Sequence, residues 1–414
     1  MNGIDDTHDP DRPCWVPGAL DPGTDFPIQN LPFGVYRRYG TLDWRTGVAI
    51  GTQVFDLAGV DADFPAPLNG LASAGRSEWQ RLRRALSTAL TGTEPPGSLA
   101  HYLTPQDEVE MRLPVDCGDY TDFFTSYHHA YNAGALFRPD DPMTPNFVWM
   151  PIAYHGRSSS IVVSGTDVRR PHGQSNPTGT APSFGPSQWL DHEVELGLVV
   201  GPGNEMGASV PIDQAEDHLF GVVLLNDWSG RDIQAWEYQP LGPFLSKSFC
   251  TTISPWIVTM EALAPFRSAS PERPDAHPEV LAHLDDRGLG QPHIDIEVEA
   301  WISCPETAEP ARLSSASYTS SYWTPAQLIA HHTSNGCPLR PGDILGTGTI
   351  SGPQGDQAGS LLELSQAGRR RLQIDGANRT FLLDGDEITL TGHCSAPGHH
   401  RIGFGAATGT IVGL

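Results

Sequence analysis

Alternating apolar and polar positions dominate this chain and predict more strands than helices. Residues 26–60 contain short alternating runs separated by turn residues, which is typical of short strands. A longer β-rich stretch begins after residue 114. The strands that we predict there are 159–163, 193–200, 222–225, 294–301 and 381–390. Within the last of these, Asp384-Gly385 predicts the tight turn of a hairpin.

Helical periodicity is confined to three segments. Residues 77–90 are the clearest helix, because apolar side chains recur every three or four positions and Gly92 follows as a stop signal. A short helix is predicted over 212–220. A third helix begins with Thr324 as its N-cap and Pro325 at its first position, and it stops at Gly336.

Composition agrees with a mainly β fold. The 414 residues include 44 glycines and 37 prolines, which favours many turns and few long helices. The first 20 residues are expected to run irregularly, and 264–292 are expected to form a surface excursion. A polar, proline-containing stretch ends near residue 114. We therefore predict an N-terminal domain over 1–114 and a C-terminal domain over 115–414.

The balance of charge restricts the partners of the protein. There are 49 acidic and 25 basic residues, so the formal net charge is −24. Such a surface repels phosphate backbones and anionic membranes, and we expect neither nucleic acid nor membrane as a partner. No apolar run approaches the length of a membrane span, and the acidic start lacks the features of a secretory signal. Six scattered cysteines without a CxxC pair favour reduced thiols in the cytoplasm.

Two glutamates two positions apart form the first candidate site. On a strand, Glu193 and Glu195 would point to one face at a separation of roughly 7 Å. Carboxylates this close repel each other unless a proton or a cation lies between them, and a hard divalent ion would suit their oxygen ligands. The segment 295–299 shows the same alternation, which is also typical of a solvated strand face. Periodicity alone leaves both interpretations open.

Two further segments add acid and base groups. Asp227 directly follows the apolar strand 222–225, where it would either serve a site or cap the next helix. Asp122 and the pair His128-His129 lie in an eleven-residue segment, 119–129, that is rich in aromatic residues. Histidine is the side chain best suited to proton transfer near neutral pH.

Lys247 is the only lysine in the chain, and its neighbours are apolar or small. If a general bias replaced lysine by arginine, the exception marks a place where a compact ammonium is needed and a planar guanidinium does not fit. The alternative is the chance survival of one lysine.

Taken in order, these segments resemble the fumarylacetoacetate hydrolase family, and the similar motifs cover nearly the whole chain. They are FPIQNLPFGVY (26–36), DYTDF (119–123), YHGRSSSIVVSG (154–165), NDWS (226–229), WEYQPLGPFL (236–245), KSF (247–249), TTISPW (251–256), NGC (335–337), LRPGD (339–343), GTISG (348–352) and FLLDGDE (381–387).

The resemblance implies a fold and an activity. The fold would be a small N-terminal β-barrel of the Src-homology (SH3-like) type, followed by a C-terminal mixed β-sandwich roll, in a homodimer. The activity would be metal-dependent hydrolysis of the carbon–carbon bond of 4-fumarylacetoacetate to fumarate and acetoacetate, in tyrosine and phenylalanine catabolism. Two alternatives stay open at this point. One is a related hydrolase of acylpyruvate-type diketo acids, and the other is a non-catalytic binding protein on the same fold.

The resemblance also assigns roles to residues. Mg²⁺ and/or Ca²⁺ would be held by the carboxylates of Asp122, Glu193, Glu195 and Asp227, and a magnesium assignment would also involve Lys247 and Thr251. The catalytic groups would be His129 as base, Glu363 as its partner, and Arg231, Gln234 and Lys247 as donors to developing negative charge. A small-molecule diketo acid would be bound by Phe124, Arg138, Tyr154, Gln234, Tyr238 and Thr349. Phe124 stands where the family has a tyrosine, and Cys250 stands where it has glycine.

Overall fold

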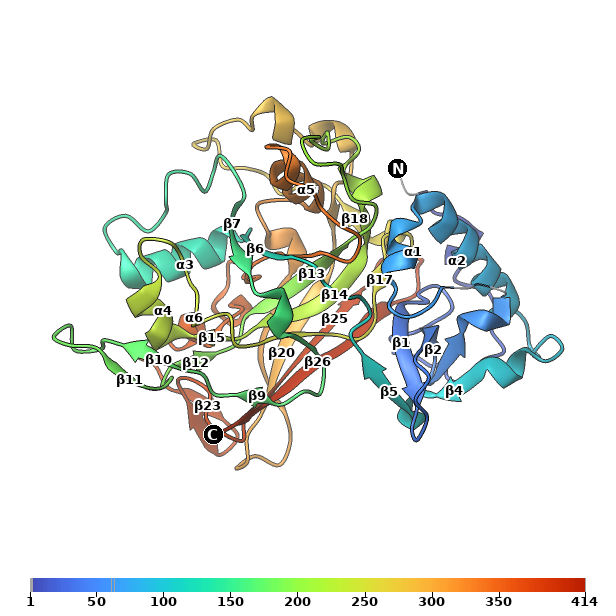
Figure 1. Ribbon diagram of the computed structural model, residues 1–414, viewed down its shortest axis with the longest axis horizontal. Coiled ribbons are helices and arrows are strands. Elements are labelled where there is room, and N and C mark those ends of the chain that lie inside the picture. The colour runs from blue at the N-terminus through green and yellow to red at the C-terminus, as the bar shows by residue number, and fades with distance from the viewer. Residues whose placement is uncertain (1–2, 61, 63, 414) are drawn as a thin grey trace.

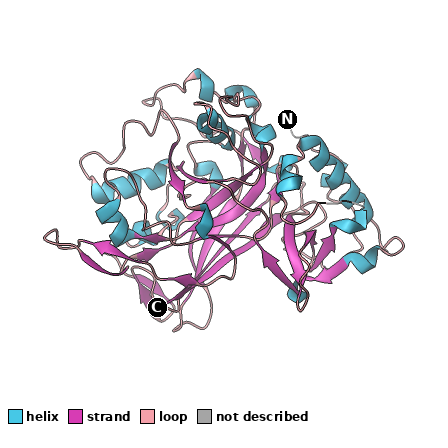
Figure 2. Ribbon diagram, in the orientation of Figure 1, coloured by secondary structure: helices cyan, strands magenta, loops and turns pink. Residues whose placement is uncertain are grey.

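The protein is described here from a computed structural model covering residues 3–60, 62 and 64–413. Strands outnumber helices, so the prediction of a mainly β protein is confirmed (Figure 2). Figure 1 shows strands β1 to β5 with helices α1 and α2 on one side of the molecule, and the larger sheets filling the rest. Among the described residues, no helix is long and apolar enough to cross a membrane.

The N-terminal sheet has five antiparallel strands in the order β4-β3-β2-β1-β5. Three of them lie in 26–60, as predicted. The strands and the two helices beside them are β1 (Phe33–Arg38), β2 (Arg45–Ile50), β3 (Gln53–Asp56), β4 (Leu103–Pro105), β5 (Val109–Arg112), α1 (Asn69–Ser73) and α2 (Arg76–Leu90). Helix α2 begins one residue before the predicted start, and its apolar positions Trp79, Leu82, Leu86 and Leu90 are buried, as the periodicity indicated.

A mixed eight-stranded sheet forms the centre of the molecule. Its order is β7-β6-β22-β13-β14-β16-β8, and β17 pairs with β14 outside this path. The pairs β6/β22 and β8/β16 are parallel. The strands are β6 (Tyr120–Phe124), β7 (Ile152–Gly156), β8 (Ile161–Val163), β13 (Val194–Val200), β14 (Leu219–Asp227), β16 (Thr251–Ile253), β17 (Val258–Thr259) and β22 (Ile344–Gly346).

This sheet is buried on both faces, which explains the continuous apolar sequence of β14. Val222 and Leu224 face the large core that the sheet shares with a second sheet. Val223 and Leu225 face a core shared with the N-terminal sheet and α2. The second sheet has the order β21-β20-β25-β26-β9. Its strands are β9 (Val168–Arg169), β20 (Glu297–Ser303), β21 (Ala311–Ser317), β25 (Glu387–Cys394) and β26 (Ile402–Val412).

Short elements surround the two sheets. The remaining strands are β10 (His172–Ser175), β11 (Ser183–Pro186), β12 (Leu190–Asp191), β15 (Ser229–Gly230), β18 (Arg267–Ser268), β19 (His293–Ile294), β23 (Leu372–Ile374) and β24 (Ala377–Arg379). The remaining helices are α3 (Tyr127–Phe137), α4 (Arg231–Glu237), α5 (Pro325–Thr333) and α6 (Leu361–Leu364). Helix α5 confirms the predicted start at Thr324-Pro325, and Gly336 follows it with a φ of +82°.

Three of the predicted elements differ in the structure. Residues 212–220 do not form a helix: a single 3-10 turn (Ala215–His218) leads into β14, because Leu219 and Phe220 are buried as its first residues. The hairpin at Asp384-Gly385 is also absent from the described chain. Strand β25 begins only at Glu387, and the preceding turn is held by Asp386, which accepts a hydrogen bond from Leu383 N at 2.8 Å. Strand β8 begins at Ile161, after a 3-10 turn over Ser158–Ser160.

Candidate active site

Four carboxylates from distant parts of the chain meet in the central sheet. Asp122 lies on β6, Glu195 on β13 and Asp227 at the end of β14, while Glu193 directly precedes β13. All four are buried, and one carboxylate oxygen from each lies within 4.8 Å of the others. The competing pattern at 295–299 behaves differently, because Glu297 and Glu299 are half-buried on the outer face of β20. The same spacing of glutamates thus places Glu193 and Glu195 in a buried cluster, but Glu297 and Glu299 on a half-exposed strand face.

Lys247 neutralises part of this cluster. Its ammonium contacts Glu193 and donates to Asp227 Oδ2 at 2.8 Å. Asp227 also accepts hydrogen bonds from Tyr154 Oη and Thr251 Oγ1, each at 2.8 Å. Burial alone would lower the pKa of Lys247, but the carboxylates of Asp227 and Glu193 outweigh burial and hold that pKa above its usual range. Lys247 is therefore a permanent cation in a buried site.

Two carboxylate oxygens of the cluster are left without a protein partner. Asp122 Oδ1 and Glu195 Oε1 are buried and accept no hydrogen bond from the described residues. Burial and the neighbouring Asp227 raise the pKa of Asp122, and burial and the neighbouring Asp122 raise that of Glu195. Gly348 N satisfies only the other oxygen of Glu195, at 3.0 Å. Unpaired oxygens from several carboxylates are the donor set of a hard divalent cation, so these residues fit one.

A histidine and a glutamate form a pair beside the cluster. His129 Nδ1 lies 2.7 Å from Glu363 Oε2. Glu363 also accepts hydrogen bonds from Asn132, Ser351 and Ser360. Burial raises the pKa of Glu363, but His129 and these hydrogen bonds outweigh it and leave that pKa below its usual value. An ionised Glu363 fixes the proton of His129 on Nδ1, which leaves Nε2 as the basic nitrogen.

Local sequence positions this pair. Helix α3 carries His129 in its first turn, and the Ser126 side chain caps the helix by accepting from His129 N at 3.1 Å. Glu363 lies on α6, which contacts α3 and is capped by Ser360. We did not predict either helix, although serine three positions before each functional residue is a capping signal.

Arg231 begins helix α4 and connects the cluster to a further buried acid. Its Nη1 lies 2.7 Å from Glu193 Oε1 and 3.1 Å from Gln234 Oε1. Its Nε donates to Asp191 Oδ2 at 2.9 Å. Burial opposes the charge of Arg231, but Glu193 and Asp191 raise its pKa overall. Sequence reasoning missed Asp191, although the spacing 191, 193, 195 continues the alternation of the two glutamates.

A cavity of about 420 Å³ brings most of the predicted residues together. Those in its wall are Asp122, Phe124, His129, Arg138, Tyr154, Glu193, Glu195, Arg231, Gln234, Tyr238, Lys247 and Thr349. The other three predicted residues lie behind the wall, and each bonds a residue of the cluster or the wall: Asp227 to Tyr154, Thr251 to Asp227, and Glu363 to His129.

The two positions that depart from the family pattern lie close to this wall. The Phe124 ring meets His129 edge-on, with centroids 5.2 Å apart. Cys250 is buried, and burial raises the pKa of its thiol to about 12. Phe124 thus contributes an apolar edge to the cavity, and Cys250 stays a neutral thiol behind it.

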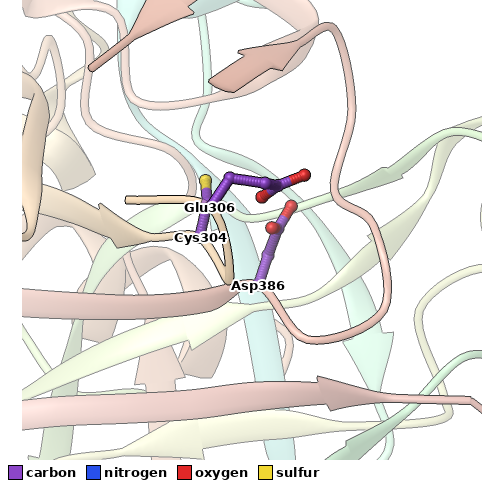
Figure 3. Close-up of side chains that lie close together, drawn as sticks. All are labelled: Cys304, Glu306 and Asp386. Atoms are coloured by element: carbon purple, nitrogen blue, oxygen red, sulfur yellow. The ribbon is translucent and has the colours of Figure 1, made fainter. Parts of the chain in front are cut away.

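A second acidic group lies elsewhere in the fold (Figure 3). It consists of Cys304, Glu306 and Asp386. The Arg379 guanidinium donates to both oxygens of Asp386 at 2.8 Å and to Glu306 Oε2 at 2.7 Å. Burial and Asp386 raise the pKa of Cys304 to about 11, so its thiol is neutral. An arginine thus pairs with both carboxylates of this group, whereas Asp122 and Glu195 in the first cluster each keep one buried oxygen without a partner among the described residues.

Two family models together match nearly the whole chain. "Fumarylacetoacetate (FAA) hydrolase C-terminal" matches residues 120–412, and "Fumarylacetoacetase N-terminal" matches residues 29–114. Curated relatives agree over similar lengths. The protein named Fumarylacetoacetase in Oryza sativa is 47% identical over 94% of this chain and 95% of its own length. The protein of that name in Homo sapiens is 41% identical, over 96% of this chain and 98% of its own length.

Solved structures are similar in fold. A structure titled fumarylacetoacetate hydrolase, from Exiguobacterium antarcticum, aligns with a TM-score of 0.54 at 17% identity, over 93% of this chain and 100% of that one. A putative HpcE protein from Mycobacterium smegmatis aligns with a TM-score of 0.53 at 21% identity, over 92% of this chain and 99% of that one.

Proposed function

The chain belongs to the fumarylacetoacetate hydrolase family, and from this premise we propose that it hydrolyses 4-fumarylacetoacetate to fumarate and acetoacetate. Its curated relatives, which are similar over nearly their full length, carry the name of a hydrolase with that substrate. The observation that carries the proposal is the meeting of the buried carboxylates, the His129–Glu363 pair and Lys247 around one cavity.

Substrate binding requires local positive charge, because the substrate is a dianion and the protein has a net charge of −24. Arg138, Arg231 and Lys247 supply that charge in the cavity wall. Among the described residues the Arg138 guanidinium donates only to Pro142 O, through Nη2, which leaves its other N–H groups free for a substrate carboxylate. The polar groups of Tyr154, Gln234, Tyr238 and Thr349 would bind the remaining oxygens, while Phe124 packs against the carbon chain.

The four carboxylates would hold a divalent cation, and we propose Mg²⁺ and/or Ca²⁺. When bound, the ion would offset their charge and polarise the carbonyl group under attack. Lys247 and Thr251 would act on this site by fixing the orientation of Asp227, because both donate to it.

Proton transfer falls to His129. Its Nε2 would take a proton from water while the water oxygen bonds to the carbonyl carbon, and Glu363 would stabilise the resulting imidazolium. The carbon–carbon bond then breaks, its electron pair leaves with the acetoacetate half as an enolate, and a proton returns to that carbon. Lys247, Arg231 and Gln234 would donate to the developing negative charge. A single donor of this kind is worth about 2.7–4 kcal/mol in other enzymes.

The finer architecture is part of the proposal. We propose domains over 1–114 and 115–414, and an SH3-like barrel in the first. Its strand order, in which the fifth strand returns to pair with the first, supports that barrel. The packing of the two larger sheets supports a sandwich roll in the second. Exposed Trp236, Leu241 and Phe244 near α4 support a homodimer that covers them. We place the protein in the cytoplasm, in tyrosine and phenylalanine catabolism.

An assay with purified protein tests the activity. We expect 4-fumarylacetoacetate to lose its ultraviolet absorbance, and equal amounts of fumarate and acetoacetate to appear. The His129→Ala variant should lose at least about 100-fold in kcat, because a positioned general base contributes roughly 10²–10⁴-fold. A chelator should abolish turnover, and Mg²⁺ or Ca²⁺ should restore it. Unchanged turnover by the His129→Ala variant would refute the base assignment.

The same assay separates the alternatives. A faster reaction with acylpyruvates than with 4-fumarylacetoacetate would assign a different diketo acid as substrate. Ligand binding without turnover of either compound would indicate a non-catalytic protein. The full-length match to relatives named Fumarylacetoacetase favours the proposed function over both of these alternatives.

A further inference from the structure

Asp191 is a wholly buried carboxylate with a complete set of hydrogen bonds. It lies on β12, two residues before Glu193, and it is 0% exposed. Oδ1 accepts from Leu361 N at 2.7 Å and from His192 N at 2.8 Å. Oδ2 accepts from Leu362 N and from Arg231 Nε, each at 2.9 Å. Asp191 does not line the cavity, so it has no direct contact with a substrate there.

The partners of Asp191 belong to two separate functional groups. Leu361 and Leu362 are the first residues of α6, the four-residue helix that carries Glu363. A helix this short lacks internal hydrogen bonds for its first N–H groups, and Asp191 satisfies two of them. Arg231, on the other side, is the cavity residue that contacts Glu193. One carboxylate therefore fixes both the element behind the base and the guanidinium beside the carboxylate cluster.

We propose that Asp191 is a positioning residue, which sets the distance between the His129–Glu363 pair and the Arg231 guanidinium. The effect that we expect on turnover rests on the proposed function. Arg231 Nε and Nη1 are divided between Asp191 and Glu193, so the plane of the guanidinium is fixed by two acids. Its Nη2 is buried and has no hydrogen-bond partner among the described residues, and it is the group that Asp191 would orient towards developing charge.

The matched variants are Asp191→Asn and Asp386→Asn. Asp386 is also 0% exposed, pairs with an arginine and accepts a backbone N–H, but it lies outside the cavity wall. Asparagine keeps the shape of each side chain but replaces one acceptor oxygen by a donor. Both variants should lower the melting temperature. Only Asp191→Asn should lower kcat, by about 10–100-fold, with KM changed less than about threefold, because interactions made only in the transition state act on kcat.

A double-mutant cycle shows whether Asp191 acts through Arg231. Arg231→Gln should itself lower kcat. The double variant Asp191→Asn/Arg231→Gln should have a kcat less than about threefold below that of Arg231→Gln, because the effects of residues that act as one unit are not additive. Equal losses of kcat in Asp191→Asn and Asp386→Asn, full additivity in the cycle, or a change confined to KM would overturn the proposal.

An experiment without substrate separates this inference from the proposed function. Hydrogen exchange of the Leu361 and Leu362 amides should become faster in Asp191→Asn and stay unchanged in Asp386→Asn. Unchanged exchange in Asp191→Asn would refute the positioning of α6, whatever the substrate proves to be. Wild-type protein that does not turn over 4-fumarylacetoacetate, but shows this pattern of exchange, would refute the proposed function alone.

Discussion

Lys247 shows how a single side chain can be constrained by both charge and size. It is the only lysine among 25 basic residues, it is 6% exposed, and its ammonium lies between Glu193 and Asp227. A guanidinium would carry the same charge, but its planar fork would place its donors differently against the same two oxygens. This geometry favours the hypothesis that the position needs a compact ammonium over the chance survival of one lysine.

Replacing Lys247 by arginine should therefore separate shape from charge. We expect Lys247→Arg to fold with a melting temperature within a few degrees of wild type, because the buried positive charge is retained. We expect kcat to fall at least about 100-fold, because a displaced donor no longer meets the developing charge. Steady-state kinetics and thermal unfolding measure the two effects. Lys247→Gln, which removes the charge, should be inactive and less stable, and wild-type kcat in Lys247→Arg would contradict this account.

At the level of single residues, the sequence predicted which side chains gather at the site better than it predicted how deeply each one is buried. All the residues expected at the site lie in or directly behind one cavity wall. The same alternation occurs in β13 and in β20, however, and only the tertiary packing decides that Glu195 is buried and Glu297 is half-exposed. Asp191 was missed for a related reason, since its partners on α6 lie 170 positions away in the chain.

At the level of elements, the turn after β22 holds Glu195 in place. Gly348 has a φ of +75°, and a Cβ atom there would lie 2.1 Å from the Phe123 carbonyl oxygen. Its N–H donates to Glu195 Oε2 at 3.0 Å. Neither the backbone conformation nor the close approach tolerates a side chain, so the turn and the carboxylate cluster depend on each other.

Gly348→Ala should consequently weaken both stability and metal binding. Gly398 is a matched control, because it also has a positive φ, of +78°, but a Cβ there would meet no atom within 4 Å. Gly398→Ala should cost only about 1 kcal/mol of unfolding free energy, from the left-handed conformation. Gly348→Ala should lower the unfolding free energy by more than that, and the variant should bind Mg²⁺ with lower affinity than the wild type. Calorimetric titration and denaturant unfolding measure both quantities, and equal effects of the two variants would contradict the explanation.

Element boundaries show where local signals suffice. The strong periodicity of α2 and the Thr324-Pro325 start of α5 were found from the sequence, because both signals lie within the element itself. The segment 212–220 was misassigned because Leu219 pairs with Val200 of β13 and Phe220 is buried within β14. The expected hairpin at Asp384-Gly385 was wrong because Arg379 and Asp386 hold that segment as a turn. Tertiary pairing overrides propensity in the first case, and side-chain hydrogen bonds within the segment do so in the second.

At the level of the whole molecule, a buried acid lies where the N-terminal segment meets the rest of the protein. Glu261 follows β17, and both of its carboxylate oxygens are buried without a hydrogen-bond partner in the described part of the chain. Its backbone oxygen lies 2.9 Å from His8 Nε2, and it shares a cavity of about 220 Å³ with Arg83 and Asp5. Burial raises the pKa of Glu261 to about 7.

The buried Glu261 carboxyl should make the stability of the protein depend on pH. The pKa of Glu261 is about 7 in the folded protein, above the usual glutamate value of 4.5 that applies in the unfolded chain. The folded state therefore binds the proton more tightly, and the stability that Glu261 contributes is complete below about pH 4.5 and lost as pH rises through 7. Between pH 5 and pH 8 the loss should be about 2–3 kcal/mol. Glu261→Gln should thus raise the melting temperature relative to wild type more at pH 8 than at pH 5, with kcat unchanged. An equal difference at both pH values would contradict the assignment.

The strand order of the central sheet also determines when the site can form during synthesis. Strand β22 lies between β6 and β13, and Gly346 pairs with Asp122 although more than two hundred residues separate them. A ribosome-bound chain that has not yet reached residue 346 holds all four carboxylates but lacks the strand between two of them. Such distant pairings form slowly, and chains that wait for them expose apolar strand edges. The proposed cation site would therefore be complete only late in translation, once β22 can pair with β6 and β13.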